Sequence, residues 1–327
     1  MKRLTSVGPG KTAMRDAEMP KIEAPNQLIV KMKYCGVCMS EHTDWEQGTA
    51  PSFGHEPIGV VYEVGEGVTR FKVGDRVSGL FGGRGEYERA IEERVFIIPD
   101  NVKDEEAVLE PLACLISAVS KVKIEAVGDR VAVVGCGYMG CGAISLLKKR
   151  GAYVVAVDIR QECLDNAKHY GADEVYLVKD LPKHYKDVPG NDLEFSSQGF
   201  GFKTVMEWTE TEEGLDLAIQ MTRQCGQLAV GAYHTGGKRL VDVQMLNVKA
   251  IDCLSTHPRE QDLFVTSCAN AVRMLGDNSW NFKSVPTKVY PVSMFDQAQG
   301  DLKTKYGKYM KALVDFERED FEPYIID

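Results

Sequence analysis

The pattern G-x-G-x-x-G stands between a predicted strand and a predicted helix in this chain of 327 residues. The predicted strand is RVAVVG and the helical stretch is CGAISLLKKRG, and the turn between them consists of Gly135, Cys136, Gly137, Tyr138, Met139 and Gly140. In such a turn the first glycine makes the bend, the second lets the backbone approach a diphosphate, and the third lets helix and strand pack closely. We therefore expect a parallel, doubly wound sheet whose turn residues Gly135, Gly137, Tyr138, Met139 and Gly140 bind a dinucleotide.

An acidic residue follows at the spacing expected for ribose binding. Asp158 ends the next apolar run, YVVAVD, 23 residues after Gly135. A carboxylate there would bond the ribose hydroxyls and repel a 2′-phosphate, which predicts NAD rather than NADP. Arg160 lies two residues further on, either as a solvated charge at a helix start or as a partial compensation for a phosphate.

The spacing of apolar runs divides the chain into a β-rich first part and a later part in which strands and helices alternate. The first hundred residues hold short Val- and Ile-rich runs between glycine turns, which predict β structure: LIVKMKYCGV, PIGVVYEVG, DRVSGLF and RVFIIPD. From about Val131 strands alternate with helices, with further strands expected at DEVYLV, KTVMEW, GQLAVGA and VKAIDCLS. Pro182–Phe202 is expected to be an irregular surface segment.

Charge and composition exclude several classes of protein. The formal net charge is −9, and no basic cluster is longer than LLKKRG, so we expect no nucleic-acid partner. No apolar run reaches the roughly 18 residues of a membrane span, and the N-terminus has no apolar core of a signal peptide. Nine scattered cysteines, an odd number, indicate reduced thiols in the cytoplasm.

The stretch YCGVCMSEHTDWEQG, from Tyr34 to Gly48, allows three interpretations. A redox Cys-x-x-Cys usually opens a helix after a strand, whereas Cys35 and Cys38 lie in the β-rich part. A structural zinc site needs a second close pair of ligands, which this region lacks. The third interpretation adds His55 and Glu56, which begin 17 residues after Cys38, and Glu110 from LEPLAC. One thiolate, one imidazole and carboxylates suit a catalytic zinc.

These motifs together resemble the medium-chain dehydrogenase/reductases, specifically the zinc-dependent alcohol and polyol dehydrogenases of the sorbitol-dehydrogenase-like branch. The resemblance rests on CGVCMSEH, GHEPIGVVYEVGEGVTRFKVGDRV, EPLAC and VAVVGCGYMG, in that order. It implies an α/β protein: a GroES-like β-rich catalytic domain and a Rossmann doubly wound parallel-sheet domain. The expected limits are 1–113 for the catalytic domain, 114–256 for the NAD-binding domain, and 257–327 for a return to the catalytic domain.

The resemblance also assigns roles to residues. Cys38, His55 and Glu56 match the catalytic metal ligands, and Glu110 matches a carboxylate that binds the metal directly or through water. Ser40 matches the hydroxyl that passes the substrate proton. Glu41 stands where the family has an aspartate that orients the histidine ligand. Trp45 matches a residue that lines the substrate cleft.

Two features depart from the family pattern. Thr43 holds the place of a relay histidine, and His42 stands one residue earlier, so the outer proton relay is not assigned. The structural zinc loop with four close cysteines is absent, and FGGRGEYERAIEERVF passes through its place. A single zinc per chain is therefore expected.

The expected function is the zinc-dependent, NAD-linked oxidation of a secondary alcohol on a polyol, sugar or cyclitol, in a cleft between the domains. Two alternatives are a zinc-free, NADPH-linked quinone or enone reductase and a non-enzymatic NAD-binding protein. The run VKAIDCLST, Val248–Thr256, is expected to be an edge strand that pairs with its own copy, as in related dehydrogenases. A homodimer, or a tetramer built from such dimers, is the expected assembly.

Overall fold

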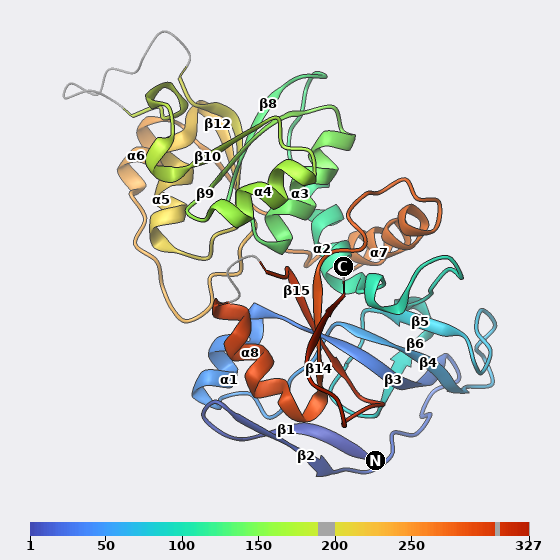
Figure 1. Ribbon diagram of the computed structural model, residues 1–327. Helices are drawn as coiled ribbons and strands as arrows, with labels where there is room; N and C mark the ends of the chain where they lie inside the picture. Colours follow the sequence, from blue (N-terminus) through green and yellow to red (C-terminus); the bar gives the residue numbers. More distant parts are fainter. Residues whose placement is uncertain (189–199, 305–307, 327) are drawn as a thin grey trace. The chain divides into compact units, whose positions relative to one another are not determined.

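The computed structural model describes residues 1–188, 200–304 and 308–326 (Figure 1). The chain forms two compact units, of which unit 1 combines Met1–Cys114 with Glu260–Asp327 and unit 2 is Leu115–Arg259. Unit 1 is thus built from both ends of the chain, drawn in blue to cyan and in orange to red. Residues 189–199 of the expected irregular segment lie outside the described residues.

Unit 1 is built on a sheet that joins early and late strands. The strand order is β16-β14-β15-β3-β4-β5-β7, and β6 also pairs with β3. Strand β15 runs antiparallel to β3, with Ala312 opposite Val37, so the chain returns to the sheet beside the Cys-x-x-Cys segment. The strands of unit 1 are β1 Lys2–Gly8, β2 Lys11–Asp16, β3 Gln27–Val37, β4 Pro57–Val64, β5 Arg76–Gly79, β6 Tyr87–Ile91, β7 Val95–Ile97, β14 Thr287–Pro291, β15 Lys311–Asp315 and β16 Tyr324–Ile326.

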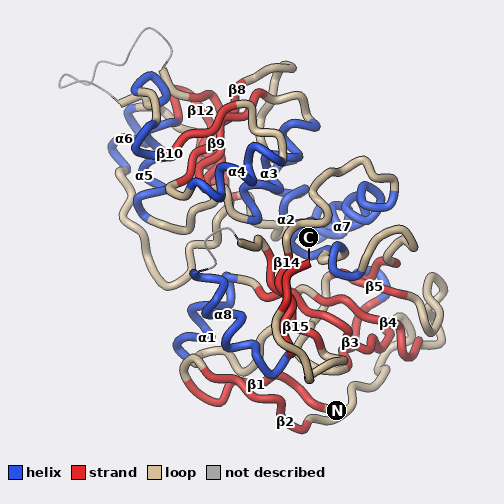
Figure 2. The backbone as a smooth tube through the Cα atoms, viewed as in Figure 1, coloured by secondary structure: helices blue, strands red, loops and turns tan. Residues whose placement is uncertain are grey.

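The helices of unit 1 lie around this sheet. A short helix follows β3 directly, and a longer one packs beside β15 and β3. Figure 2 shows α1 and α8 next to each other at one side of the strands. The helices are α1 His42–Gln47, α7 Gln261–Gly276 and α8 Phe295–Thr304, and α2 Leu109–Ser120 begins in this unit.

Unit 2 is a parallel, doubly wound sheet, as the alternation of apolar runs predicted. All six strands are parallel in the order β10-β9-β8-β11-β12-β13. The strands are β8 Arg130–Val134, β9 Tyr153–Asp158, β10 Glu174–Leu177, β11 Phe202–Glu207, β12 Thr222–Val230 and β13 Asp252–Ser255; the helices are α3 Tyr138–Lys149, α4 Gln161–His169, α5 Glu212–Met221 and α6 Val243–Val248.

Helices cover both faces of this sheet, so its central strands are apolar on both sides. Ala132 and Val134 of β8 join the core cluster that contains Leu215, Ala218 and Ile219 of α5. The alternate residues of β8 point to the opposite face, and α3 and α4 are drawn on the other side of the strands from α5 and α6 (Figures 1 and 2).

The prediction of a strand over Val248–Thr256 is wrong in its extent, because only Asp252–Ser255 forms a strand. Val248 is the last residue of α6, and Ala250 has a left-handed backbone with φ of 50°. An apolar run alone does not distinguish the last turn of a helix from the start of a strand. Strand β13 is nevertheless the edge of the sheet, as predicted.

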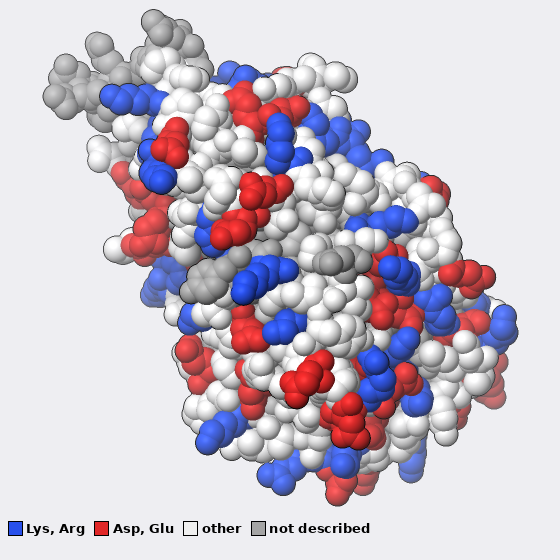
Figure 3. All heavy atoms as spheres, viewed as in Figure 1, with Lys and Arg blue, Asp and Glu red and all other residues white. Residues whose placement is uncertain are grey.

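Among the described helices, none is long and apolar enough to cross a membrane. Acidic and basic side chains are interspersed over the face drawn in Figure 3.

A cluster of tyrosines surrounds one carboxylate at the amino edge of the parallel sheet. Glu174 at the start of β10 accepts hydrogen bonds from Tyr153 (2.8 Å), Tyr176 (2.8 Å) and Tyr185, and Arg130 Nη2 lies 3.0 Å from it. Burial would raise the pKa of Glu174, but the hydrogen bonds from Tyr185, Tyr176 and Tyr153 and the Arg130 charge outweigh it, so the pKa falls to about 2.

We predict that Glu174→Gln lowers the free energy of unfolding by about 1–3 kcal/mol at neutral pH, the value of hydrogen bonds to a charged group. Because the folded-state pKa lies below the ordinary value of 4.5, the contribution is present above that pH and is lost as the pH falls toward 2. Urea unfolding of both proteins between pH 7 and pH 3 measures the difference. The exposed Glu66→Gln is the matched control, and a wild-type advantage that stays constant down to pH 3 contradicts the prediction.

Candidate metal centre and nucleotide-binding turn

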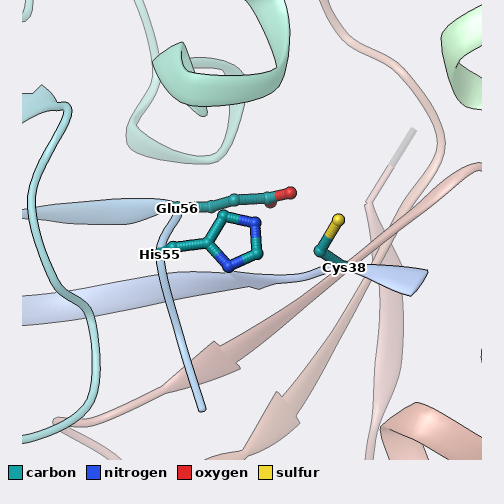
Figure 4. Close-up of side chains that lie close together, drawn as sticks. All are labelled: Cys38, His55 and Glu56. Atoms are coloured by element: carbon teal, nitrogen blue, oxygen red, sulfur yellow. The ribbon is translucent and has the colours of Figure 1, made fainter. Parts of the chain in front are cut away.

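Three side chains of unit 1 point toward one another. Cys38 follows the end of β3, and His55 and Glu56 immediately precede β4. These strands are antiparallel neighbours with Cys35 opposite Pro57, which brings the two segments together. One candidate ligand atom from each of the three residues lies within 4.8 Å of the others. Figure 4 shows the three side chains pointing toward one another.

The carboxylate of Glu56 fits because residue 36 has no side chain. A Cβ placed on Gly36 would lie 1.7 Å from Glu56 Oε2 and 2.8 Å from Glu56 Cβ. Gly36 N also donates a hydrogen bond to the Glu56 carbonyl oxygen at 2.9 Å. The glycine inside the Cys-x-x-Cys pattern thus makes room for a carboxylate that is only 1% exposed.

A buried lysine from the far end of the chain balances this carboxylate. Lys311 Nζ of β15 lies 2.7 Å from Glu56 Oε1 and 2.5 Å from Oε2, and it also donates to the Val37 carbonyl at 3.3 Å. Burial lowers the pKa of Lys311, but the charges of Glu56 and Cys38 outweigh it, so its pKa is raised. Glu56 Oε2 accepts no hydrogen bond of good geometry.

Glu41 orients the imidazole of His55. Its Oε1 lies 3.0 Å from His55 Nδ1 and accepts a hydrogen bond from Gly54 N at 2.8 Å. A carboxylate accepts only, so Nδ1 carries a proton and Nε2 is left as the metal-binding nitrogen. Burial lowers the pKa of His55, but hydrogen bonds with Cys38 and Glu41 outweigh it, so the pKa is raised. The surroundings thus favour positive charge at this point.

These residues fit a zinc ion by their donor chemistry. A thiolate, an imidazole and a carboxylate converge, and the buried oxygen Glu41 Oε2 lacks a hydrogen-bond partner among the described residues. Three protein ligands of this kind are typical of a catalytic zinc, which keeps a fourth position for water or substrate. Oxygens without a donor are favourable only beside a cation or water.

Two other predicted residues lie near these ligands. Ser40 Oγ donates to Cys38 Sγ at 3.3 Å. Glu110, in the first turn of α2, does not belong to the close cluster of three, although its electrostatic partners are His55 and Glu56. Burial first, and then the charge of Glu56, raise the pKa of Glu110 to about 6.

Other residues of the stretch from Tyr34 to Gly48 are held inside unit 1. His42 is 7% exposed, with Nδ1 3.4 Å from Gln299 Oε1. Trp45 Nε1 donates to Asp296 Oδ1 at 2.8 Å, and its ring packs against a core cluster. Cys35 is buried, and burial raises the pKa of its thiol. Cys35 is therefore a core residue, as free cysteines commonly are.

The glycine-rich turn of unit 2 has the geometry that its three glycines predicted. Gly135 has φ of 92°, a left-handed conformation that favours glycine. A Cβ on Gly140 would lie 1.9 Å from the Gly135 carbonyl oxygen, so α3 packs closely on the turn. A Cβ on Gly137 would meet nothing within 4 Å, which leaves open space at the start of α3. Tyr138 and Met139 form the first turn of that helix.

Asp158 ends β9 and is held beside this turn. Its Oδ2 accepts from Cys136 N at 2.8 Å, and its Oδ1 accepts from Arg160 N at 2.9 Å. The Arg160 side chain forms an ion pair with Asp158 at 3.3 Å. The arginine is thus directed toward the carboxylate.

Sequence reasoning missed two residues that contact the carboxylates Glu56 and Glu110. Lys311 lies in an ordinary β run 255 residues from Glu56, and only the β15–β3 pairing brings it there. Cys114 Sγ donates to Glu110 Oε1 at 3.3 Å. The spacing of four residues on α2 could have indicated this second contact, because such residues share a helix face.

Comparisons with known proteins agree with this arrangement. A family model described as alcohol dehydrogenase GroES-like domain matches residues 24–99, and one described as zinc-binding dehydrogenase matches residues 139–266. The (R,R)-butanediol dehydrogenase of Bacillus subtilis (strain 168) is 34% identical over 257 residues, which cover 65% of this chain and 72% of that protein. The sorbitol dehydrogenase of Halalkalibacterium halodurans is 27% identical over 347 residues, covering 95% and 97% of the two chains.

The fold comparison leads to the same family. The crystal structure of 2R,3R-butanediol dehydrogenase from Bacillus subtilis superposes with a TM-score of 0.76 at 25% identity, covering 96% of this chain and 99% of that one. The predicted GroES-like and Rossmann architecture is therefore confirmed. This chain belongs to the zinc-dependent medium-chain dehydrogenase/reductase family and is a zinc-type alcohol dehydrogenase.

Proposed function

We propose that this enzyme oxidises a secondary alcohol of a polyol, sugar or cyclitol to a ketone with NAD, reversibly. The observation that carries the proposal is the convergence of Cys38, His55 and Glu56 within 4.8 Å, in a chain that also carries the dinucleotide turn. Relatives named as sorbitol, D-xylulose and D-arabitol-phosphate dehydrogenases or reductases support the substrate class. In this proposal residues 1–113 and 257–327 form the catalytic domain, and 114–256 form the NAD-binding domain.

The proposed roles divide between the protein and its bound groups. When bound, zinc supplies the Lewis acidity that eases deprotonation of an alcohol, and the nicotinamide accepts the hydride. Cys38, His55 and Glu56 would hold the metal, with Glu110 as a further carboxylate. Ser40 Oγ, hydrogen-bonded to Cys38 Sγ, would receive the substrate proton. Trp45 is proposed to line the substrate site.

The alternatives are less well supported. A zinc-free reductase has no use for a thiolate, an imidazole and a carboxylate arranged around one point. A protein that only binds NAD has no use for them either. The match to a zinc-binding dehydrogenase model also favours the metal enzyme.

The first prediction for this function concerns the metal. The purified enzyme is expected to hold a single zinc per chain and to form NADH from one or more members of a panel of polyols, cyclitols, sugars and secondary alcohols. Cys38→Ser removes one ligand, so zinc content and turnover should fall at least tenfold while the fold remains. Elemental analysis, absorbance at 340 nm and circular dichroism measure the three quantities.

Cys225→Ser, the same change at an exposed thiol, is the matched control and should keep zinc and activity. Full activity of a zinc-free wild-type protein, or two tightly held zinc ions per chain, is incompatible with the proposal.

The second prediction concerns the choice of cofactor. We propose that Asp158 bonds the adenosine ribose and repels a 2′-phosphate, so kcat/KM should be much higher with NAD than with NADP. Asp158→Asn removes the charge but keeps an acceptor for Cys136 N, and it should narrow the ratio by about tenfold, or 1.4 kcal/mol. Steady-state kinetics with both cofactors provide the test. A wild-type preference for NADP would show the assignment of Asp158 to be wrong and would direct attention to Arg160.

We also propose that two chains pair through β13. This strand is the sheet edge, and three large apolar side chains around the start of α6 are exposed, namely Leu240 (81%), Val241 (38%) and Val243 (68%), the first residue of the helix. Thr256 N donates to Val230 O of β12, so by strand alternation the N–H groups of Cys253 and Ser255 face the free edge. An antiparallel copy of the strand would satisfy these groups across a two-fold axis.

The third prediction tests this pairing. Cys253→Pro removes an N–H that faces the free edge and adds a ring there, so the dimer should dissociate at micromolar concentration. Cys253→Ser keeps the N–H and is the control. Sedimentation velocity gives the oligomeric state. A wild-type enzyme that is monomeric and fully active at that concentration excludes the proposal.

A further inference from the structure

The carboxyl ends of β11 and β12 meet at a corner occupied by one indole. Trp208 follows the last residue of β11, and its ring covers Gly231 after β12, where a Cβ would lie 2.6 Å from Trp208 Cζ2. The backbone of Trp208 adjoins the glycine-rich turn, since a Cβ on Gly135 would lie 2.7 Å from its carbonyl carbon. The indole therefore lies between the dinucleotide turn and the end of β12.

The indole nitrogen at this corner has no partner. Trp208 Nε1 is buried and makes no hydrogen bond within the described part of the chain. An indole N–H is a donor only, and leaving it buried without an acceptor is unfavourable.

A second orphaned atom belongs to His234 in the neighbouring loop. His234 Nε2 lies 2.9 Å from Oε2 of Glu207, a carboxylate with no solvent exposure. The other oxygen, Oε1, accepts from Thr209 N and Thr209 Oγ1, both at 2.6 Å. A carboxylate accepts only, so in the neutral imidazole the proton lies on Nε2 and Nδ1 is an acceptor. His234 Nδ1 is buried and also lacks a partner in the described structure.

The backbone around these atoms is held in an unfavourable conformation. His234 has φ of 53° and Glu210 has φ of 65°, both in the left-handed region without being glycine. Glu210 Oε1 ties the two loops together by accepting from Thr235 N at 3.0 Å and Thr235 Oγ1 at 2.9 Å. Strain of this kind concentrates at ligand sites, where the surrounding structure holds it in place.

We propose that Trp208 Nε1 and His234 Nδ1 hydrogen-bond the nicotinamide riboside half of the dinucleotide, an inference that rests on the proposed NAD-linked function. One orphan is a donor and the other an acceptor, which matches a group that carries both kinds of atom. The carboxamide and the ribose hydroxyls of that half do so. Trp208 and His234 are thus cofactor-positioning residues.

The position of Trp208 and His234 on the sheet edge indicates that they contact the nicotinamide half of the cofactor and not the adenosine half. In a doubly wound sheet the dinucleotide crosses the carboxyl edge where the strand order reverses, here between β8 and β11. Asp158 on β9 lies on the side assigned to adenosine. Trp208 and His234 follow β11 and β12, on the other side of the crossing.

The test compares two probes, NADH and ADP, which share the adenosine diphosphate portion. Trp208→Phe keeps an aromatic ring but removes the N–H, and it should weaken NADH binding by about five- to tenfold, the effect of one hydrogen bond, without changing ADP binding. His234→Asn tolerates the left-handed backbone but is too short to reach both Glu207 and a ligand, and it should act in the same direction. Isothermal titration gives both affinities, and circular dichroism checks the fold.

Energy transfer from tryptophan to bound NADH is a second readout. It should fall sharply in Trp208→Phe and persist in the control Trp280→Phe, which makes the same change in the core of unit 1.

Unchanged NADH affinity in Trp208→Phe overturns the inference. An equal loss for NADH and ADP also overturns it, because the indole would then support the turn instead of contacting the nicotinamide half. A wild-type protein that binds neither probe refutes the proposed NAD-linked function itself.

Discussion

A buried ion pair joins the two ends of the chain within unit 1. Glu56 is 1% exposed in the core of unit 1, where an isolated negative charge would be strongly unfavourable. Lys311, 6% exposed, supplies the opposite charge from β15, and the β15–β3 ladder holds it there. Removing one member of such a pair commonly costs about 3–5 kcal/mol, because the other charge is left buried. The return of the chain after unit 2 therefore completes the charge balance of the metal centre.

The same carboxylate imposes a steric condition on the Cys-x-x-Cys segment. Gly36 lies against Glu56, and any side chain at that position would occupy the place of Oε2. Cys35 packs into the core on one side of this glycine, and Cys38 reaches the metal centre on the other. The two cysteines thus have different roles, and their spacing reflects a strand that passes a buried carboxylate closely. This arrangement disfavours both a redox dithiol and half of a closed zinc knuckle.

Local sequence patterns predicted the glycine-rich turn and most of the secondary structure. Contacts between segments far apart in the chain could not be predicted from the sequence. The turn at Gly135–Gly140 was predictable because its glycines are required by the backbone conformation and close packing of the turn itself, within a few residues. Cys38, His55 and Glu56 were grouped through a family resemblance, since spacing alone does not say which strands are neighbours. Lys311 has no motif around it, and only the strand pairing places it at Glu56. At Val248 the apolar run was assigned to a strand, although it ends α6, because periodicity is ambiguous over so few residues.

Four unsatisfied polar atoms lie in the two candidate ligand sites, and their chemistry differs between the sites. Seven buried side-chain atoms of the described residues lack a hydrogen-bond partner, and four of them lie in the two candidate sites. At the candidate metal centre both are carboxylate oxygens, Glu41 Oε2 and Glu56 Oε2; they suit a positive charge, and the second already lies 2.5 Å from the Lys311 ammonium. At the corner of unit 2 they are one donor and one acceptor, Trp208 Nε1 and His234 Nδ1, which suit a neutral polar group. A folded protein normally pairs its buried polar atoms. An unpaired acceptor therefore indicates a missing donor or cation, and an unpaired donor indicates a missing acceptor.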